Sequence, residues 1–535
     1  MRHWIFAFST LLIFPSPEAA AASPAHCGPT VELDALQLLR QASLDLRGRV
    51  PSYEEYELVR GSENTRLMAE ALIDEMLESP EYFAQVRQYH RGLLWGSLDE
   101  TVLPALTHGQ KRVRASGAGL WFATGRRRHH RGDNIICLNQ PQTEFDAEGR
   151  PIPIETYDDP VCTGGTCQRE GFVMVEPYWA PGTEVKVCAF DAQEADVGTN
   201  GVSCASSTGN PACGCGPGMI WCVPDRGEID ELLRQSLAEE PARIFEWVVH
   251  ERRPYLDAFT TPITLMNGPI AHYYAHNTGG FAVHQNGGIT YDIQIPDVPS
   301  LPYEAVDAWE PVERGPSHAG ALTTMGFLVR FASNRERASH FYSTFYCDPF
   351  VPSDDGLPPE EAHPDPNLRE RAGCADCHAV LDAAAAHWGR WRTSGTHGFL
   401  DVDFDVPRDE CLCGEGEDRS CNAFCNAYFV TGDNSSGEEL QRFSGLPQAA
   451  AWLEPVDHLA VEDGPRALAT TEAARERIAR CTVRHLGEHL LGRELGSADL
   501  EWLHEHTQAF VDGGFDFTAL FRRLVLDERY RSIRP

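Results

Sequence analysis

The sequence predicts a mainly α-helical protein whose helical modules are interrupted by two cysteine-rich insertions of loops and short β strands. Two observations predict this fold class. Apolar residues recur at helical spacing near both ends and in the middle of the chain. The stretches between them are rich in glycine, proline and cysteine and lack that periodicity. The expected parts are a leader at 1–22, helical modules at 23–100, 227–314, 315–400 and 451–535, and cysteine-rich insertions at 101–226 and 401–450.

The first 22 residues have the pattern of a secretory signal peptide. Arg2 and His3 form a short basic start, Trp4 to Phe14 is mostly apolar, and Ala19 to Ala22 supply the small residues that suit a signal peptidase. The apolar run is too short to span a bilayer, and no other stretch approaches roughly 18 apolar residues. We therefore expect an exported protein without a membrane span, located in the periplasm, at the cell surface or outside the cell.

Composition bounds the partners of the chain. Its 535 residues allow roughly two to four domains, and 42% hydrophobic residues are enough for real cores. The chain has 79 acidic against 45 basic residues, a formal net charge of −34. This charge argues against nucleic acid or an anionic membrane as a partner. It suits a basic partner, or simply a solvated acidic surface.

The N-terminal module is expected to contain four helices. An apolar stripe predicts a first helix that ends at Gly48 and Pro51. Ser52 and Glu55 form a capping box for the second helix, which stops near Gly61. The third helix is expected at Arg66 to Leu77, and the pair Ser79-Pro80 starts the fourth.

The first insertion carries eight cysteines and a basic island at Arg126 to Arg131. An even number of cysteines in a loop-rich exported segment predicts four disulfides with unassigned pairing, and metal binding is the minor alternative. Short β runs are expected at Gly171 to Glu176 and Glu184 to Cys188. Beyond the insertion we expect two helices, at Glu228 to Leu237 and at Pro241 to His250, with the proline in a first turn. The eight cysteines are Cys137, Cys162, Cys167, Cys188, Cys204, Cys213, Cys215 and Cys222.

The stretch Cys374-Ala-Asp-Cys377-His378 is a CxxCH motif, the attachment signature of c-type haem. Two thiols three positions apart on a helical turn can each bond one vinyl group of the porphyrin, and the following histidine can ligate the iron. The motif predicts one covalent haem c, held by Cys374 and Cys377, with His378 as proximal ligand. A disulfide or redox-active pair, or a structural zinc site, are the alternatives. No second CxxC pair is present to complete a zinc site.

The sixth iron ligand stays open at this point. His318 and Met325 are the candidates, because both lie in the same module as the motif and a neutral imidazole or a thioether can serve. Of the two, His318 is favoured. A five-coordinate iron open to small ligands is the alternative. Four further histidines are near in sequence: His340, His363, His387 and His397.

The second insertion contains four cysteines within fifteen residues, which predict two disulfides in a small loop. The alternating carboxylates before them, Asp401, Asp403 and Asp405, lack the glycine and the distal glutamate of a calcium loop, so calcium is only a minor alternative. Cys347 and Cys481 remain as a bridge between the third and the closing module. His485 and His489 share one helix face and could hold a metal, but no third ligand is visible in the sequence, so packing is favoured.

Several stretches of the chain resemble the planctomycete-type cytochrome c proteins and their secreted myxobacterial homologues, in the order of that family's modules. They are Leu36 to Glu55, Leu77 to Tyr82, Arg253 to Tyr274, Ser317 to Arg392 and Cys481 to Tyr530. Within the fourth stretch, Asp382 and the alanines that follow replace the Asp-Pro-Leu-Gly-Phe common in the family. The resemblance implies an exported mono-haem protein more strongly than it implies a reaction.

These observations lead to three functional hypotheses. The first is a one-electron carrier in an extracytoplasmic redox system. Its redox partner is unidentified, and the acidic charge of the chain would suit a basic one. The second is a haem enzyme, such as a peroxidase or oxidase, with an open iron site. The third is a disulfide-rich cell-surface binding protein without cofactor. The sequence shows no nucleophile triad, phosphate loop or HExxH pattern that would indicate hydrolysis or nucleotide chemistry.

Overall fold

A computed structural model describes most of the chain. The described residues are 31–98, 110–115, 118–123, 136–160, 163–195, 214–219, 226–276, 291–292, 298–351, 368–369, 371, 373–391, 398, 400–401, 407–414, 420–422, 425–426, 429–446 and 457–533. The expected leader, the basic island at 126–131, and Asp403 and Asp405 lie outside them. The described residues are mainly helical, as expected, with short strands concentrated in the first cysteine-rich insertion. None of their helices has the length and apolarity needed to cross a bilayer.

The N-terminal module contains the four expected helices: α1 (Ala35–Arg47), α2 (Tyr53–Gly61), α3 (Thr65–Met76) and α4 (Pro80–Leu93). Gly48 ends α1 in the left-handed conformation, with φ 67°, which glycine adopts without steric penalty. Ser52 and Glu55 form the predicted capping box of α2. The apolar residues at the start of the first stripe are not helical, because Val31 and Glu32 form the short strand β1.

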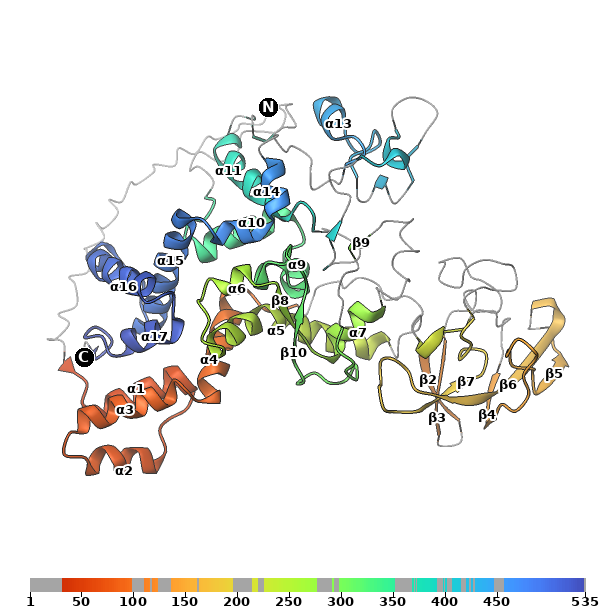
Figure 1. Ribbon diagram of the computed structural model, residues 1–535, viewed down its shortest axis with the longest axis horizontal. Helices are drawn as coiled ribbons and strands as arrows, with labels where there is room; N and C mark the ends of the chain where they lie inside the picture. The colour runs from red at the N-terminus through yellow and green to blue at the C-terminus, as the bar shows by residue number, and fades with distance from the viewer. Residues whose placement is uncertain are drawn as a thin grey trace, which may run out of the picture.

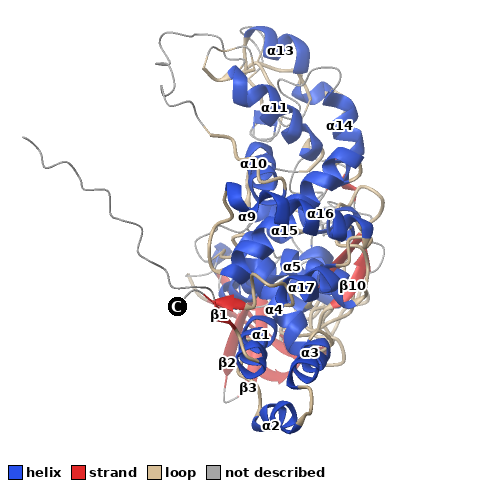
Figure 2. Ribbon diagram, turned by 90° about the vertical axis from the view of Figure 1, so that its left-hand side faces the viewer, coloured by secondary structure: helices blue, strands red, loops and turns tan. Residues whose placement is uncertain are grey.

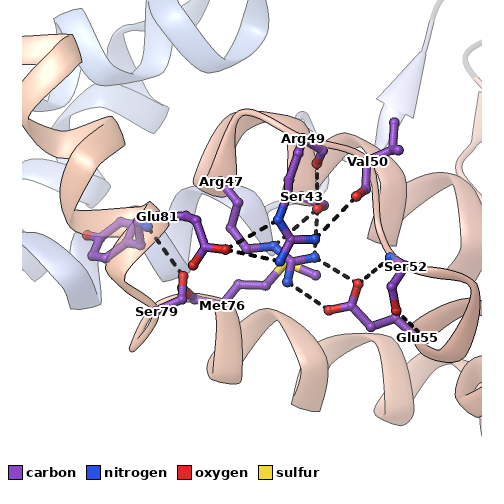
Figure 3. A network of polar contacts seen from close by, with 10 residues as sticks. Ser43, Arg47, Arg49, Val50, Ser52, Glu55, Met76, Ser79 and Glu81 are labelled. Atoms are coloured by element: carbon purple, nitrogen blue, oxygen red, sulfur yellow. Dashed lines mark hydrogen bonds and ion pairs between the residues drawn. The ribbon is translucent and has the colours of Figure 1, made fainter.

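A buried arginine holds the start of this module together (Figure 3). Arg47 donates two hydrogen bonds to the Glu55 carboxylate, at 2.7 and 3.0 Å, and further bonds to the Ser43 hydroxyl. Ser43 in turn donates to the Arg49 carbonyl, and Arg49 pairs with Glu81 of α4. Arg47 lowers the pKa of Glu55 through these hydrogen bonds. These polar residues thus tie α1, α2 and α4 together.

The C-terminal helices pack directly on this module. They are α15 (Glu472–Leu491), α16 (Leu500–Asp512) and α17 (Phe517–Val525), followed by the strand β12 (Ser532–Ile533). β12 pairs antiparallel with β1, so the two ends of the described chain lie side by side (Figure 2). The Tyr530 hydroxyl donates to Asp45 at 2.6 Å, and Arg522 forms a bidentate pair with Asp74.

The centre of the molecule is organised around α5 (Arg226–His250), α6 (Asp257–Thr260), α7 (Gly268–His276) and a hairpin of β8 (Ile263–Met266) with β10 (Glu310–Glu313). The expectation of two helices separated before Pro241 is wrong, because α5 runs through this proline. Proline removes one helical hydrogen bond and frees the carbonyl four residues before it. The freed Leu237 carbonyl faces Gly326 of the next segment, where a Cβ would come within 2.0 Å of it.

The first insertion forms a sheet rather than only loops. Its strands are β2 (Gln110–Ala115), β3 (Ala118–Ala123), β4 (Ile136–Pro141), β5 (Glu155–Asp158), β6 (Thr166–Val175) and β7 (Val185–Cys188). They are ordered β2-β3-β7-β6-β4, with β5 also on β6. The two runs expected to be strands become β6, which begins earlier than expected, and β7. Cys137 and Cys188 form a disulfide with each other. Cys167 and Cys215 each take part in a disulfide as well.

The sheet packs on the central helices through a core cluster of its own. This cluster joins Trp179, Val187 and Met219 of the insertion to Leu237 of α5 and Tyr273 of α7. Figure 1 shows the sheet at one end of the molecule, the N- and C-terminal helices at the other, and α5 and α7 between them. The insertion is therefore stabilised by apolar packing as well as by disulfides.

The segment around the CxxCH motif consists of η4 (Gly320–Thr323), α9 (Met325–Arg330), α10 (Asn334–Phe345), α11 (Ala375–Ala385) and η6 (Ala386–Trp388). α13 (Gly437–Phe443) and α14 (Asp457–Asp463) follow the second insertion, and the short strands β9 (Tyr291–Asp292) and β11 (Leu400–Asp401) pair with each other. In the second insertion, Cys411 bonds Cys425 and Cys413 bonds Cys421, which confirms the two predicted disulfides.

Candidate haem-attachment site

The two cysteines of the CxxCH motif lie at the beginning of α11. Cys374 is the residue before the helix and Cys377 follows one turn later. Both thiols are free and half-buried. Every other cysteine among the described residues is disulfide-bonded. Since the other described cysteines are all in disulfides, these two free thiols stand out. They have the spacing and the chemistry for covalent attachment of a porphyrin.

His378 is held in a defined orientation by a carboxylate one turn further along α11. Its Nδ1 lies 3.0 Å from Asp382 Oδ1. Because a carboxylate only accepts hydrogen bonds, Nδ1 carries the proton and donates it. Nε2 then holds the free lone pair, and it is the atom that would ligate a metal.

Asp382 is itself fixed from a second helix. Its side chain is 6% exposed, and Arg335 of α10 contacts both of its oxygens, at 2.7 and 2.9 Å. A bidentate arginine holds a carboxylate in one plane and fixes its orientation. The chain Arg335, Asp382, His378 therefore positions the imidazole ring through groups from two helices.

The alanines after Asp382 continue α11 and lead into η6. Ala384, Ala385 and Ala386 are buried, and Trp388 donates from its indole N–H to the Leu322 carbonyl at 3.0 Å. Small side chains let the end of α11 and η6 approach α14 closely.

His318, the favoured sixth ligand, is fully buried next to the segment that follows α11. Its Nδ1 lies 2.5 Å from the Thr323 hydroxyl, and its ring centroid is 6.4 Å from that of Trp391. Burial lowers its pKa well below the ordinary value, so the ring is neutral. The ring also has a hydrogen-bond contact with the Ile263 backbone, which raises the pKa against the effect of burial. A neutral imidazole can serve as an iron ligand, but here both sides of the ring face polar groups of the protein.

Met325, the other candidate, is buried in the cluster that joins the sheet to α5 and α7. Trp388 and Ala384, at the end of the CxxCH helix, belong to the other, larger core cluster. Met325 therefore contributes to the packing of α9 against the centre of the molecule. Its role as an iron ligand stays a prediction, as does that of His318.

The remaining histidines of this region have other surroundings. His340 is stacked on Phe331 with ring centroids 4.1 Å apart, and burial lowers its pKa to about 4. His387 donates from Nδ1 to the Gly464 carbonyl at 2.9 Å. His363 and His397 lie outside the described residues.

The other cysteine and histidine groups are structural. Cys347 and Cys481 form the predicted bridge, and His485 Nε2 lies 3.5 Å from Cys347 Sγ. Both sulfurs are used by the disulfide, so no thiolate is left to bind a metal there. His489 packs against Tyr89 instead. The described residues contain two clusters of three side chains of metal-binding type, Cys347, Cys481 and His485, and Cys137, Glu170 and Cys188. Neither cluster includes a CxxCH residue, so a zinc site at the motif gains no support.

Comparisons of the chain with protein families, curated proteins and solved structures found no match. Asp382 and Arg335 are residues of the candidate site for which the sequence analysis predicted no role. The spacing of His378 and Asp382, four residues apart on a helix, was a usable signal because such pairs lie on one helix face. Arg335 had no comparable signal, since it comes from a different helix.

Proposed function

We propose that the protein is a mono-haem c-type cytochrome that transfers single electrons outside the cytoplasm. The observation that carries the proposal is the state of the CxxCH residues. Cys374 and Cys377 are the only free thiols among the described cysteines, and His378 presents Nε2 because Asp382 holds Nδ1. Export itself is supported by the disulfides, which form in oxidising compartments.

The role of each residue follows from its position. Cys374 and Cys377 would hold the porphyrin through thioether bonds, and His378 would ligate the iron through Nε2. When bound, haem supplies one-electron chemistry by cycling between ferric and ferrous iron. Asp382 accepts a charge-assisted hydrogen bond from the Nδ1–H of His378, which makes the imidazole a stronger electron donor through Nε2. Arg335 keeps the carboxylate in place and offsets part of its charge.

A haem enzyme is the second candidate, and the same hydrogen bond favours it. A carboxylate behind the proximal histidine makes the imidazole a stronger electron donor, which favours higher oxidation states of the iron. If no side chain occupies the sixth position, that donor strength would serve reactions with small ligands rather than electron transfer alone.

The test is expression in cells with a haem-attachment system, followed by visible spectra of the oxidised and reduced protein and by acid extraction. We expect a sharp reduced α band and haem that stays with the polypeptide. A low-spin spectrum supports electron transfer, whereas a high-spin spectrum that changes with peroxide supports the enzyme.

The matched variants are C374S/C377S and D376N. The double variant should lose covalent haem. Asp376 lies between the two cysteines and is exposed, so D376N should keep the haem. Circular dichroism checks that both variants fold. If the wild type carries no haem while a reference cytochrome matures in the same cells, the proposal fails, and a cofactor-free binding protein becomes the better description.

A further inference from the structure

A hollow of about 420 Å³ lies between α4, the loop after it, α5 and the segment before β10. This volume is in the range of pockets that hold small organic ligands. Its wall is mostly polar, and it lies apart from the CxxCH residues, none of which lines it. The feature that separates it from the rest of the surface is its charge.

Four arginines line the hollow: Arg87 and Arg91 from α4, and Arg234 and Arg243 from α5. Only two carboxylates, Glu239 and Asp307, belong to the same lining. Among the lining residues alone, the arginines outnumber the carboxylates by two in a chain whose net charge is −34, although Glu246, which does not line the hollow, pairs with Arg87 and Arg243. An oxyanion entering the hollow meets the opposite sign to that of the protein as a whole.

The existing ion pairs use only part of the donor capacity of these arginines. Arg87 contacts Glu239 at 3.1 Å and Glu246 at 2.9 Å, Arg91 contacts Glu239 at 2.7 Å, and Arg243 contacts Glu246 at 3.4 Å. Each guanidinium has five N–H donors in a planar fork that matches a carboxylate or a phosphate.

Arg234 adds a second guanidinium group from α5 to the lining. It lies 3.7 Å from Glu231, whose side chain is 60% exposed, so this particular ion pair is long and solvated.

Two N–H groups of the wall also lack an acceptor. Arg243 Nε and Trp309 Nε1 are shielded from solvent without a hydrogen-bond partner. The Arg243 guanidinium lies 4.5 Å from the centre of the Trp309 ring, which fixes both side chains. The pKa of Arg243 is lowered mainly by burial and, to a smaller extent, by the positive charge of Arg87. The two N–H groups without an acceptor and the lowered pKa of Arg243 describe a site that lacks hydrogen-bond acceptors, which an anion would supply.

The floor of the hollow is held in shape independently of any ligand. The Asn267 amide donates to the Ser236 hydroxyl at 2.8 Å and to the Val306 carbonyl at 2.9 Å. These bonds join α5, the start of α7 and the segment before β10. A preformed wall lowers the entropy cost of binding.

We propose that this hollow binds a small organic anion through a carboxylate or phosphate group, with Arg87, Arg91, Arg234 and Arg243 as the recognising residues. The site does not depend on haem. It joins the N-terminal module to the centre of the molecule, so a bound anion stabilises the packing of α4 on α5.

The test is calorimetric titration of the full-length exported protein at low ionic strength with citrate, inorganic phosphate and glucose. We expect saturable binding of citrate or phosphate and none of glucose. Citrate alone defines a carboxylate site, phosphate alone defines a phosphate site, and binding of both defines a general oxyanion site. At 0.5 M salt the affinity should fall at least tenfold, because the contacts are electrostatic.

Variants separate the site from general charge attraction. R91Q and R234Q should each weaken binding at least tenfold, and R91K should weaken it less because it keeps the charge but loses the fork. R60Q removes one charge from an exposed arginine of α2 and should have no effect. Circular dichroism confirms that each variant folds.

Two results would overturn the proposal: no saturable binding of either anion, or a loss in R60Q equal to that in R91Q. The C374S/C377S protein should bind the anion as the wild type does. Failure of the haem proposal and failure of this one are thus distinguishable.

Discussion

At the scale of single residues, the side chain of His378 is defined by what it contacts rather than by its motif alone. Its Nδ1 donates to Asp382, which in turn is held by Arg335. In metal sites, such a carboxylate raises the basicity of the histidine ligand and fixes its orientation. The reduction potential of a haem bound here is therefore expected to depend on Asp382.

The variant D382N should raise the reduction potential of the haem-loaded protein. A neutral amide pulls less on the Nδ1 proton, so the imidazole donates less and the ferric state loses stabilisation. The loss of one charge-assisted hydrogen bond is expected to shift the potential upward by roughly 100 mV. Redox titration followed at the α band measures it. D376N removes the same charge from an exposed position of the same helix, and an equal shift in that control would refute the assignment.

Glu240 is a buried acid with an unusual protonation equilibrium. Burial raises its pKa to about 7, although it accepts hydrogen bonds from the Gly326 N–H and the Thr264 hydroxyl. In the unfolded chain this carboxyl has the ordinary glutamate pKa of 4.5. The folded state therefore binds a proton over a pH range in which the unfolded state has lost it, so its contribution to stability falls as pH rises.

The variant E240Q should remove this pH dependence. Between pH 4.5 and 8 the unfolding free energy of the wild type, measured relative to E240Q, is expected to fall by about 3 kcal/mol and then level off. Urea unfolding at a series of pH values gives both curves. The comparison is needed because His90 acts in the opposite direction: burial lowers its pKa to about 3, so it destabilises the fold as pH falls below 6.5. A constant difference between the two proteins would contradict the prediction.

At the scale of elements, α9 is packed unusually closely on α5. A Cβ at Gly326 would lie 2.0 Å from the Leu237 carbonyl oxygen and 2.9 Å from Pro241 Cδ. The same glycine donates its N–H to Glu240 at 2.8 Å. Pro241 and Glu240 of α5 and Gly326 of α9 thus meet in one contact between the two helices.

The variant G326A should destabilise the protein by about 3 kcal/mol, because backbone atoms cannot move aside as a flexible side chain can. Denaturant unfolding measures the change. The matched control is G92A in α4, where a Cβ meets nothing within 4 Å. That variant should be neutral or stabilising by about 0.5–1 kcal/mol, since alanine favours helix over glycine. Similar losses in both variants would show that the close approach is not the cause.

At the scale of the whole molecule, helices far apart in the sequence share one core. The larger cluster contains Leu38 of α1, Phe245 of α5, Phe341 of α10, Trp388 after α11 and Phe521 of α17. The disulfide between Cys347 and Cys481 joins the end of α10 to α15, and Arg335 joins α10 to the CxxCH helix. The candidate site is thereby attached to the terminal helices by covalent and polar links.

Removing this disulfide should cost more stability than removing a local one. The Cys347–Cys481 bridge spans 134 residues and the Cys413–Cys421 bridge spans 8. Since the entropy of the unfolded chain rises with the length of the loop released, C347A/C481A should lose roughly 5 kcal/mol and C413A/C421A roughly 2.5 kcal/mol. Thermal unfolding of the two double variants compares them. A larger loss in the short-loop variant would contradict the expectation.

The sequence by itself determined the features that depend on neighbouring residues. Helix boundaries such as Gly48, the capping box of Ser52 and Glu55, and the strands near 171–176 and 184–188 were predicted correctly, because caps, turns and periodicity are local. The number of disulfides in the second insertion followed from cysteine spacing. The CxxCH motif likewise named its own residues.

Tertiary structure decided the features that depend on residues distant in the chain. The helix α5 continues through Pro241, and Gly326, distant in sequence, lies against the freed Leu237 carbonyl. Arg335 reaches Asp382 from another helix, and the arginines of α4 and α5 meet around one hollow. No local pattern contains these pairings, since burial and three-dimensional proximity, rather than spacing along the chain, create them.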